Sequence, residues 1–250
     1  MIPLRDTIPT RRFPVVNTAI IAINVLVFLF EFLIEIALGP EALNSLIRTW
    51  GLVPAHLLRV GGPINWLSIF TSMFMHGGWW HLISNMLALY IFGDNIEDRL
   101  GPVRYVFFYL FGGLAASAAH VIVHSNSTLP TVGASGAIAG VLGAYLVLYP
   151  QARVVTLLPI FYFIRIVELP ALIYLGFWFI SQLFNGLFAL TDASALQSGG
   201  VAWWAHIGGF VFGLAIIKLI APPPPPPQYP QYPSGHPYTY LHRDDDRYRW

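Results

Sequence analysis

The sequence predicts an all-α, polytopic membrane protein, a bundle of six transmembrane helices. Of the 250 residues, 56% are hydrophobic and only 10% are charged, against about a quarter charged in typical soluble domains. The mean hydropathy of +0.63 is correspondingly high. The apolar residues also gather into stretches that are long enough for a helix to cross a bilayer. A soluble core cannot cover this much apolar surface, whereas lipid can.

Each predicted span has about 20 mostly apolar residues, because in hydrocarbon every backbone polar group must be satisfied within its own helix. Six stretches meet this condition: 14–38, 79–93 with an apolar approach from Leu67, 103–124, 133–149, 168–190 and 202–221. The first stretch is too long and too polar for a cleaved signal peptide, and no small-residue cleavage site follows it. We expect it to remain in the mature protein.

Basic residues predict the orientation in the membrane. With six spans, both termini lie on one side of the bilayer, and the side richer in Lys and Arg is usually cytoplasmic. Two basic residues, Arg48 and Arg59, fall in the loops opposite the termini. Eleven fall on the side of the termini: Arg5, Arg11, Arg12, Arg99, Arg104, Arg153, Arg165, Lys218, Arg243, Arg247 and Arg249. The sequence therefore predicts cytoplasmic termini, and six spans suit a prokaryotic inner membrane.

The predicted membrane domain covers residues 14–221, between a cytoplasmic N-terminal segment, 1–13, and a cytoplasmic tail, 222–250. The tail begins with six consecutive prolines and has no periodic apolar face, so we expect it to be disordered. Such a polyproline stretch can bind a proline-motif partner of the SH3 or WW type, although it is more often a solvated spacer.

Charge and residue types exclude several classes of function. A formal net charge of +1 is not that of a nucleic-acid binder. The sequence contains no Cys, which excludes disulfides, thiolate metal sites and a cysteine nucleophile, and it contains no HExxH zinc motif. His120 and His124 share a helix face, but no third metal ligand accompanies them. The sequence therefore predicts no metal or other cofactor, and a nucleophile would have to be an oxygen.

Polar residues within the spans are candidate functional residues, because they are costly in a membrane. In the first span, packing or contact with the interface explains the polar residues better than catalysis does; they are Asn17, Asn24, Glu31 and Glu35. In the second span, His81 and Asn85 are four residues apart and share one face. The pair could hold a developing negative oxygen or hydrogen-bond to a neighbouring helix. His76 points elsewhere, and we expect it to brace the preceding loop.

Glycines predict close contact between the fourth and sixth spans. Gly136 and Gly140 form a GxxxG pattern, and a second such pattern begins at Gly209. Small residues let two helices approach closely, and His206 lies one turn before Gly209. Two such helices facing each other would place His206 beside Ser135.

The polar residues of spans two, four and six also lie at a similar predicted depth in the membrane, which favours one common site. Spans two, four and six are predicted to run in the same direction, and their polar residues lie within about two turns of the outer ends. Gly133 to Gly136 delay the start of the fourth helix, which leaves room for water above Ser135. Asp192 is the only acid in the outer loop before the sixth span, and it is poorly placed to orient His206. The arrangement therefore predicts a serine–histidine dyad.

The predicted chemistry is acyl transfer. Ser135 would attack a carbonyl, while His206 would remove the serine proton and later give it to the leaving amine. The resulting oxyanion would be held by His81, by Asn85 and by the backbone N–H of Ser135 at the start of a helix.

The set of motifs resembles the rhomboid family of intramembrane serine proteases over about residues 14–220. These motifs are His76 with the His81–Asn85 pair, Gly93-xxx-Glu97-xxx-Gly101, Gly133-Ala-Ser-Gly136 and Ala205-His206-xx-Gly209, in that order. The resemblance implies a rhomboid-like bundle that cleaves peptide bonds in or beside the transmembrane helices of substrate proteins in the lipid bilayer. It assigns Ser135 and His206 to catalysis, and His81, Asn85 and the Gly133 loop to the oxyanion and substrate.

The resemblance further implies no cofactor and a structural role for Glu97, which would close a cytoplasmic turn through backbone hydrogen bonds. His76, Gly136 and Gly209 would support the site. It also implies that the fifth span is a mobile lateral gate, with Trp178, Phe179 and Gln182. One departure concerns Ala139, because many relatives carry an aromatic residue there that packs on the catalytic histidine. Another residue must then orient His206, or the imidazole is less well held.

Two other functions remain open. A catalytically silent member of the family would bind transmembrane clients without cutting them, although such proteins usually lose the serine or the histidine. A small transporter would use the polar residues as a path through the membrane: Glu31, Glu35, His81 and His206. That reading leaves the common depth of the site residues unexplained.

Overall fold

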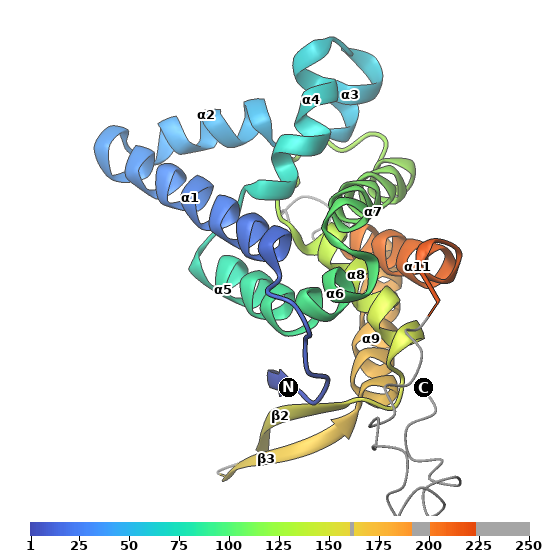
Figure 1. The fold of residues 1–250 in the computed structure, drawn as a ribbon. Coiled ribbons are helices and arrows are strands. Elements are labelled where there is room, and N and C mark those ends of the chain that lie inside the picture. Colours follow the sequence, from blue (N-terminus) through green and yellow to red (C-terminus); the bar gives the residue numbers. More distant parts are fainter. Residues whose placement is uncertain (161–162, 192–200, 224–250) are drawn as a thin grey trace, which may run out of the picture.

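Four apolar helices of the computed structural model are long enough to cross a membrane, among the residues that the structure describes, 1–160, 163–191 and 201–223. They are α1 (Val15–Leu38), α7 (Pro102–Val123), α9 (Ala171–Thr191) and α11 (Trp203–Ile220). Each coincides with a predicted span to within a few residues, and together they form the body of a mainly helical bundle (Figure 1). The prediction of a helical, multi-pass membrane protein is confirmed.

The fourth predicted span is shorter than expected. It forms α8 (Ser135–Leu148), whose 14 residues extend about 21 Å at 1.5 Å per residue, less than the roughly 30 Å of a hydrocarbon core. Every residue from Gly136 to Tyr145 is buried. Since protein rather than lipid surrounds this helix, it does not need the length of a lipid-facing span.

The second predicted span is a helix of mixed geometry. It consists of α5 (Trp79–Ala88) and a π turn (Leu89–Gly93), and the helix continues beyond the predicted end as α6 (Asp94–Leu100). At the π turn, the side chain of Asn17 donates to the Leu89 carbonyl over 2.9 Å and accepts from the Tyr105 hydroxyl over 2.8 Å. A side chain at Gly93 would overlap both Asn17 and Tyr105. Asn17 therefore joins three helices, in keeping with the expected packing role.

Three short helices follow α1 and lie at the end of the molecule away from the N-terminus (Figure 1). They are α2 (Pro40–Trp50), α3 (Pro54–Arg59) and α4 (Pro63–Thr71), and a 3₁₀ turn (Ser72–Phe74) leads from α4 towards α5. Each begins at a proline, which suits the first helical position because its missing N–H would have no partner there. An antiparallel bridge between Leu52 and Thr131 ties this region to the segment before α8.

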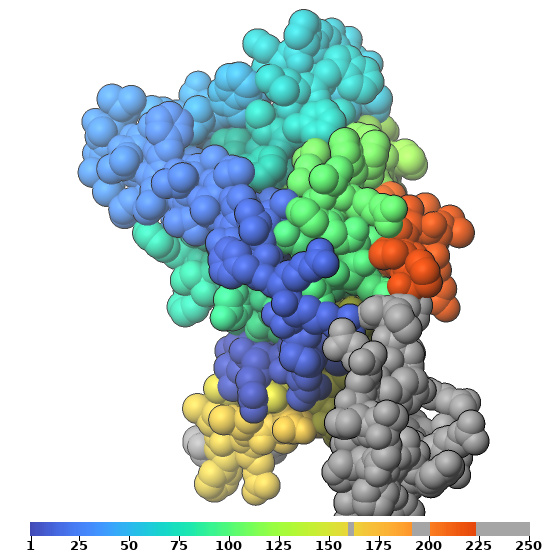
Figure 2. Space-filling model, viewed as in Figure 1, coloured from blue at the N-terminus to red at the C-terminus, as the bar shows by residue number. Residues whose placement is uncertain are grey.

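A three-stranded antiparallel sheet lies at the opposite end, where the sequence analysis expects loops. Its strands, in spatial order, are β1 (Ile2–Asp6), β2 (Arg153–Ile160) and β3 (Phe163–Pro170). β2 and β3 form a hairpin between α8 and α9, which is why α9 begins at Ala171 rather than near residue 168. The N-terminal residues lie against this hairpin (Figure 2).

The N-terminal strand is also fastened to the bundle by a buried carboxylate. Asp6 accepts hydrogen bonds from the Tyr145 hydroxyl at the far end of α8 and, over 2.9 Å, from the Asn95 side chain in α6. Burial raises the pKa of Asp6, and the hydrogen bond from Tyr145 partly offsets that rise. The N-terminal strand therefore packs against α6 and α8. Most of the proline-rich tail, from residue 224, lies outside the described residues.

Candidate active site

The serine of the candidate site is the first residue of α8, and a glycine before it shapes the approach. Gly133 has a φ of +135°, which L side chains rarely adopt, and its N–H donates to the Ser72 carbonyl over 2.8 Å. A Cβ at Gly133 would lie 2.7 Å from the His81 ring and 3.5 Å from the Ser135 Oγ. The chain thus turns sharply into the helix, with the His81 imidazole close to the serine.

Glycines bring α8 and α11 into backbone contact, as the sequence predicts. A Cβ at Gly209 would overlap the Gly136 carbonyl, and a Cβ at Gly213 would overlap the Gly140 carbonyl. The two GxxxG patterns therefore face each other. His206 lies one turn before Gly209, and this contact carries it to the first turn of α8.

The structure places the serine and histidine side chains in direct contact. The Ser135 Oγ and the His206 Nε2 are 2.8 Å apart, within hydrogen-bond distance. His206 is buried, while Ser135 is partly exposed. A hydroxyl held against an imidazole nitrogen in this way can pass its proton to that nitrogen as it attacks a carbonyl.

The other imidazole nitrogen contacts α9, which the sequence analysis does not predict. The His206 Nδ1 lies 2.8 Å from the Gln182 Oε1. The Trp178 ring, one turn earlier on α9, lies 5.8 Å from the His206 ring between centroids. Two signals could have indicated this contact: a glutamine within an apolar span, and a tryptophan four residues before it on the same face. Asp192 lies outside the described residues.

The expected oxyanion residues lie on one face of α5. The Gly77 N–H donates to the His81 Nδ1 over 3.4 Å, a long hydrogen bond that leaves the proton on Nε2, near Gly133 and Ser135. Asn85 lies one turn further along. Its Nδ2 is buried, and within the described part of the chain it has no hydrogen-bond acceptor. Both side chains thus have a donor that no other described group uses.

His76 lies beside this pair rather than in it. Its ring packs edge-on against the His81 ring with centroids 5.1 Å apart, and its backbone N–H donates to the Glu31 Oε2 over 3.1 Å. Glu31 is 2% exposed, whereas Glu35 is exposed. Glu31 therefore holds the loop before α5 from the first span, and His76 supports His81.

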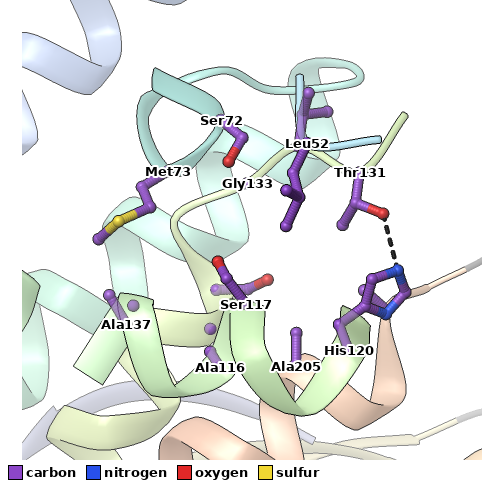
Figure 3. Close-up of a pocket in the computed structure, with 15 residues that line it drawn as sticks. Leu52, Ser72, Met73, Ala116, Ser117, His120, Thr131, Gly133, Ala137 and Ala205 are labelled. Atoms are coloured by element: carbon purple, nitrogen blue, oxygen red, sulfur yellow. Dashed lines mark hydrogen bonds between the residues drawn. The ribbon is translucent and has the colours of Figure 1, made fainter. Parts of the chain in front are cut away.

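Ser135 is one of the residues that line a small cavity, which Figure 3 shows with Ser72, Gly133 and Thr131 at its edge. Its volume is about 30 Å³, and the polar residues that line it include Ser72, Ser117, His120 and Thr131. The cavity is large enough for about two water molecules. The His120 Nε2 lies 3.0 Å from the Thr131 Oγ1, and the ring stacks on that of His124. No cluster of three metal-ligating side chains occurs among the described residues.

Comparison with known proteins then places this arrangement in a family. A family model described as the rhomboid domain matches residues 63–223, more than half of the chain. The chain belongs to the rhomboid family. The matched region runs from α4 to beyond α11, so it contains Ser135, His206, His81 and Gln182, while α1 and the N-terminal strand precede it.

Several curated rhomboid proteins are similar to this chain. Rhomboid protein 1, mitochondrial, of Saccharomyces cerevisiae is 29% identical over 202 residues, which cover 78% of this chain and 50% of that protein. Rhomboid protease GluP of Bacillus subtilis is 35% identical over 133 residues, 53% of this chain and 24% of GluP. Putative rhomboid protease YdcA of Bacillus subtilis is 29% identical over 136 residues, 54% of this chain and 63% of YdcA. This rhomboid chain thus spans less than two thirds of the length of each.

The acid of the GxxxExxxG motif contacts a different segment from the one that the rhomboid resemblance implies. Glu97 is 4% exposed, and its two carboxylate oxygens accept from the backbone N–H groups of Val16 and Asn17 over 3.0 and 2.7 Å. It therefore caps the first turn of α1, where N–H groups have no partner within the helix. Glu97 joins α6 to the first span, far along the chain from its own turn.

Proposed function

We propose that this rhomboid chain is an intramembrane serine endopeptidase, with Ser135 as nucleophile and His206 as general base and acid. The observation that carries the proposal is the 2.8 Å contact between the Ser135 Oγ and the His206 Nε2 inside a membrane bundle. Family membership and similarity to proteins named rhomboid proteases support it. The substrates would be transmembrane proteins, cut in or beside their membrane helices.

The proposed reaction has two steps. The Ser135 Oγ bonds to the substrate carbonyl carbon while its proton moves to the His206 Nε2. His206 then gives that proton to the leaving amine, the peptide bond breaks and an acyl-enzyme remains. In the second step water loses a proton to His206 and attacks the ester. His206 then gives this proton to the Ser135 Oγ as the ester bond breaks, which releases the new carboxyl end and restores the serine. No metal or cofactor takes part in this scheme.

Donors around Ser135 would hold the oxyanion of both tetrahedral intermediates. The backbone N–H of Ser135 belongs to the first turn of α8, where no helical carbonyl can accept from it. The His81 Nε2 and the Asn85 Nδ2 are the side-chain donors on the facing helix. Such donors stabilise developing charge strongly where bulk water is excluded, and losing one typically costs about 100- to 1,000-fold in rate.

Hydrolysis within the membrane also needs water. The cavity of about 30 Å³ beside Ser135 is lined by the hydroxyls of Ser72, Ser117 and Thr131, which can hold water near the serine. We propose that it supplies the water that attacks the acyl-enzyme.

The proposed orientation places the sheet and both termini in the cytoplasm of a prokaryotic cell, with the dyad near the outer surface. The excess of basic residues on the side of the termini supports it. The proline-motif partner of the tail remains a prediction that depends on residues outside the described ranges.

Labelling with a fluorophosphonate, which reacts with activated serines, tests the dyad. We expect the detergent-solubilised parent to be labelled, and both Ser135→Ala and His206→Ala to lose labelling. Cleavage of a membrane-embedded helical substrate should be lost with the same two changes. Labelling that persists in Ser135→Ala would contradict the assigned nucleophile. An unlabelled parent that still binds transmembrane clients would indicate a catalytically silent member, and ion flux without cleavage a transporter.

A further inference from the structure

We propose that Gln182 is the positioning residue for His206, in the place that a carboxylate occupies in a serine–histidine–aspartate triad. This inference rests on the proposed function. Gln182 is 5% exposed and His206 is 8% exposed, so water does not compete freely for their 2.8 Å contact. Within the described residues, Gln182 is the hydrogen-bond partner of the His206 Nδ1.

The orientation of the Gln182 amide follows from its other contacts. Its Nε2 donates to the Trp178 carbonyl over 3.1 Å and to the Ser181 hydroxyl over 3.0 Å. The Ser181 hydroxyl donates to the same Trp178 carbonyl over 2.6 Å, so its oxygen is free to accept from Gln182. With the amide nitrogen engaged on its own helix, the carbonyl oxygen Oε1 must be the atom that faces His206.

This orientation fixes the protonation of the imidazole. An amide oxygen only accepts hydrogen bonds, so the His206 Nδ1 must carry the proton that it donates to Gln182. A neutral imidazole with its proton on Nδ1 has its lone pair on Nε2. That lone pair faces the Ser135 Oγ at 2.8 Å, as a general base requires. Gln182 thus selects the tautomer that can accept the serine proton.

The helix that carries Gln182 also supplies an aromatic ring for the histidine. The Trp178 ring lies 5.8 Å from the His206 ring at an interplanar angle of 33°, and it also packs on Phe210 at 5.9 Å. Ala139 is fully buried at 0% exposure, and its methyl group offers the histidine neither a ring nor a hydrogen bond. α9 therefore provides both the hydrogen bond and the ring contact that Ala139 cannot.

A neutral amide differs from a carboxylate in one measurable respect. Glutamine orients the imidazole but gives little charge stabilisation to the imidazolium that forms during attack. The titratable groups that face His206 from other helices are Ser135 of α8, His81 of α5 and His120 of α7, and none of them is an acid. Gln182→Glu should therefore put a carboxylate beside this imidazole, where the described residues otherwise supply none.

Two substitutions at this position test the proposal through the rate of fluorophosphonate labelling and of substrate cleavage across pH. Gln182→Leu keeps the size of the side chain and removes the acceptor. We expect it to lower the labelling rate and kcat by about 10- to 100-fold, with KM and the melting temperature nearly unchanged. Gln182→Glu should retain activity and move the acid limb of the pH–rate profile by about one pH unit or more. Asn185→Leu is the matched control, because Asn185 is exposed on the same helix. It should leave the labelling rate and the pH–rate profile unchanged.

A readout independent of catalysis separates this inference from the proposed function. The ¹⁵N chemical shifts of the His206 ring should report a proton on Nδ1 in the parent and a mixture of tautomers in Gln182→Leu. If the parent labels and Gln182→Leu labels equally fast at every pH, the positioning role is wrong while the dyad stands. If the parent never labels but the tautomer shift appears, the proposed function fails and the positioning contact stands. Identical pH profiles for the parent and Gln182→Glu would also overturn the proposal.

Discussion

The helix that carries His206 meets its two neighbours in different ways. Against α8, α11 packs backbone on backbone, because Gly209 and Gly213 lie against the carbonyls of Gly136 and Gly140. Against α9, it packs through side chains: Gln182 and Trp178 contact His206, and Phe179 stacks on Phe210 at 4.5 Å. α8 is buried along most of its length, whereas much of α9 is exposed to the surroundings.

Each of the two interfaces therefore determines a different property of the candidate dyad. The glycine contact fixes the separation of the helix backbones and therefore the distance from serine to histidine, with little room for adjustment. The side-chain contact fixes the orientation and tautomer of the imidazole, and side chains can repack. We therefore expect substitutions in the first interface to affect folding and activity together, and substitutions in the second to affect mainly activity.

The largest expected effect comes from Gly209→Val, which breaks the backbone contact. Its side chain would collide with the Gly136 carbonyl, so the helices would have to separate and carry His206 away from Ser135. Overpacking of this kind typically costs about 1–3 kcal/mol or more in stability. We expect a lower melting temperature in detergent and no detectable fluorophosphonate labelling.

The matched control for that variant is a glycine on α9. A Cβ at Gly176 meets no atom within 4 Å, so Gly176→Ala should raise stability slightly, by about 0.5–1 kcal/mol, and leave labelling unchanged. If Gly209→Val were tolerated as well as Gly176→Ala, the α8–α11 contact would not be the rigid interface described above.

A smaller effect is expected from Trp178→Leu, which weakens the ring contact on the other face of α11. Aromatic contacts of this geometry contribute about 0.5–1.5 kcal/mol, which corresponds to a loss of about 2- to 10-fold in the labelling rate. The melting temperature should change much less than in Gly209→Val. Equal losses of stability in the two variants would remove the distinction between the interfaces.

The smallest effect concerns the far end of α8, where Tyr145 bonds to Asp6 near Asp94. Burial raises the pKa of Asp94 to about 6, the nearby Asp6 adds to the rise, and the Asn95 backbone N–H opposes it. In the unfolded chain an Asp titrates near pH 4. The folded state thus favours the protonated form of Asp94. The stability that this protonated carboxyl contributes is present below about pH 4 and is lost as pH rises through about 6.

Asp94→Asn should therefore flatten the dependence of the free energy of unfolding on pH between about 4 and 6, because the amide does not titrate. Asp6, whose pKa is also raised, would leave a residual slope. Thermal unfolding in detergent at a series of pH values measures the effect. Parallel curves for the parent and the variant would show that Asp94 does not titrate in this range, and the labelling rate should stay the same in both.

Hydropathy and glycine spacing predicted most of the architecture, because a bilayer imposes length and composition on any helix that crosses it. The sequence therefore indicated α1, α7, α9 and α11 to within a few residues, and the two GxxxG patterns indicated that Ser135 and His206 would meet. Motif order predicted the family, which the comparisons confirm.

Other contacts between distant segments, which no glycine pattern marks, could not be predicted in this way. β1 has only five residues, which include a proline and two charged residues, and it forms a strand through pairing with β2, so composition alone predicts a loop. The partner of His206 depends on how α9 is rotated about its axis, and local periodicity does not specify that rotation. The resemblance therefore implies a gating role for Gln182, whereas its contact with the imidazole follows only from the structure.

The pairing of β1 with β2 has a consequence for biosynthesis. Asp6 and Tyr145 are 139 positions apart, so during synthesis Asp6 must wait until Tyr145 has been added before this hydrogen bond can form. Closing such a long loop is slow compared with forming a local hairpin. The N-terminal strand would then pair with β2 only after the first four spans have been inserted, when most of the bundle has assembled.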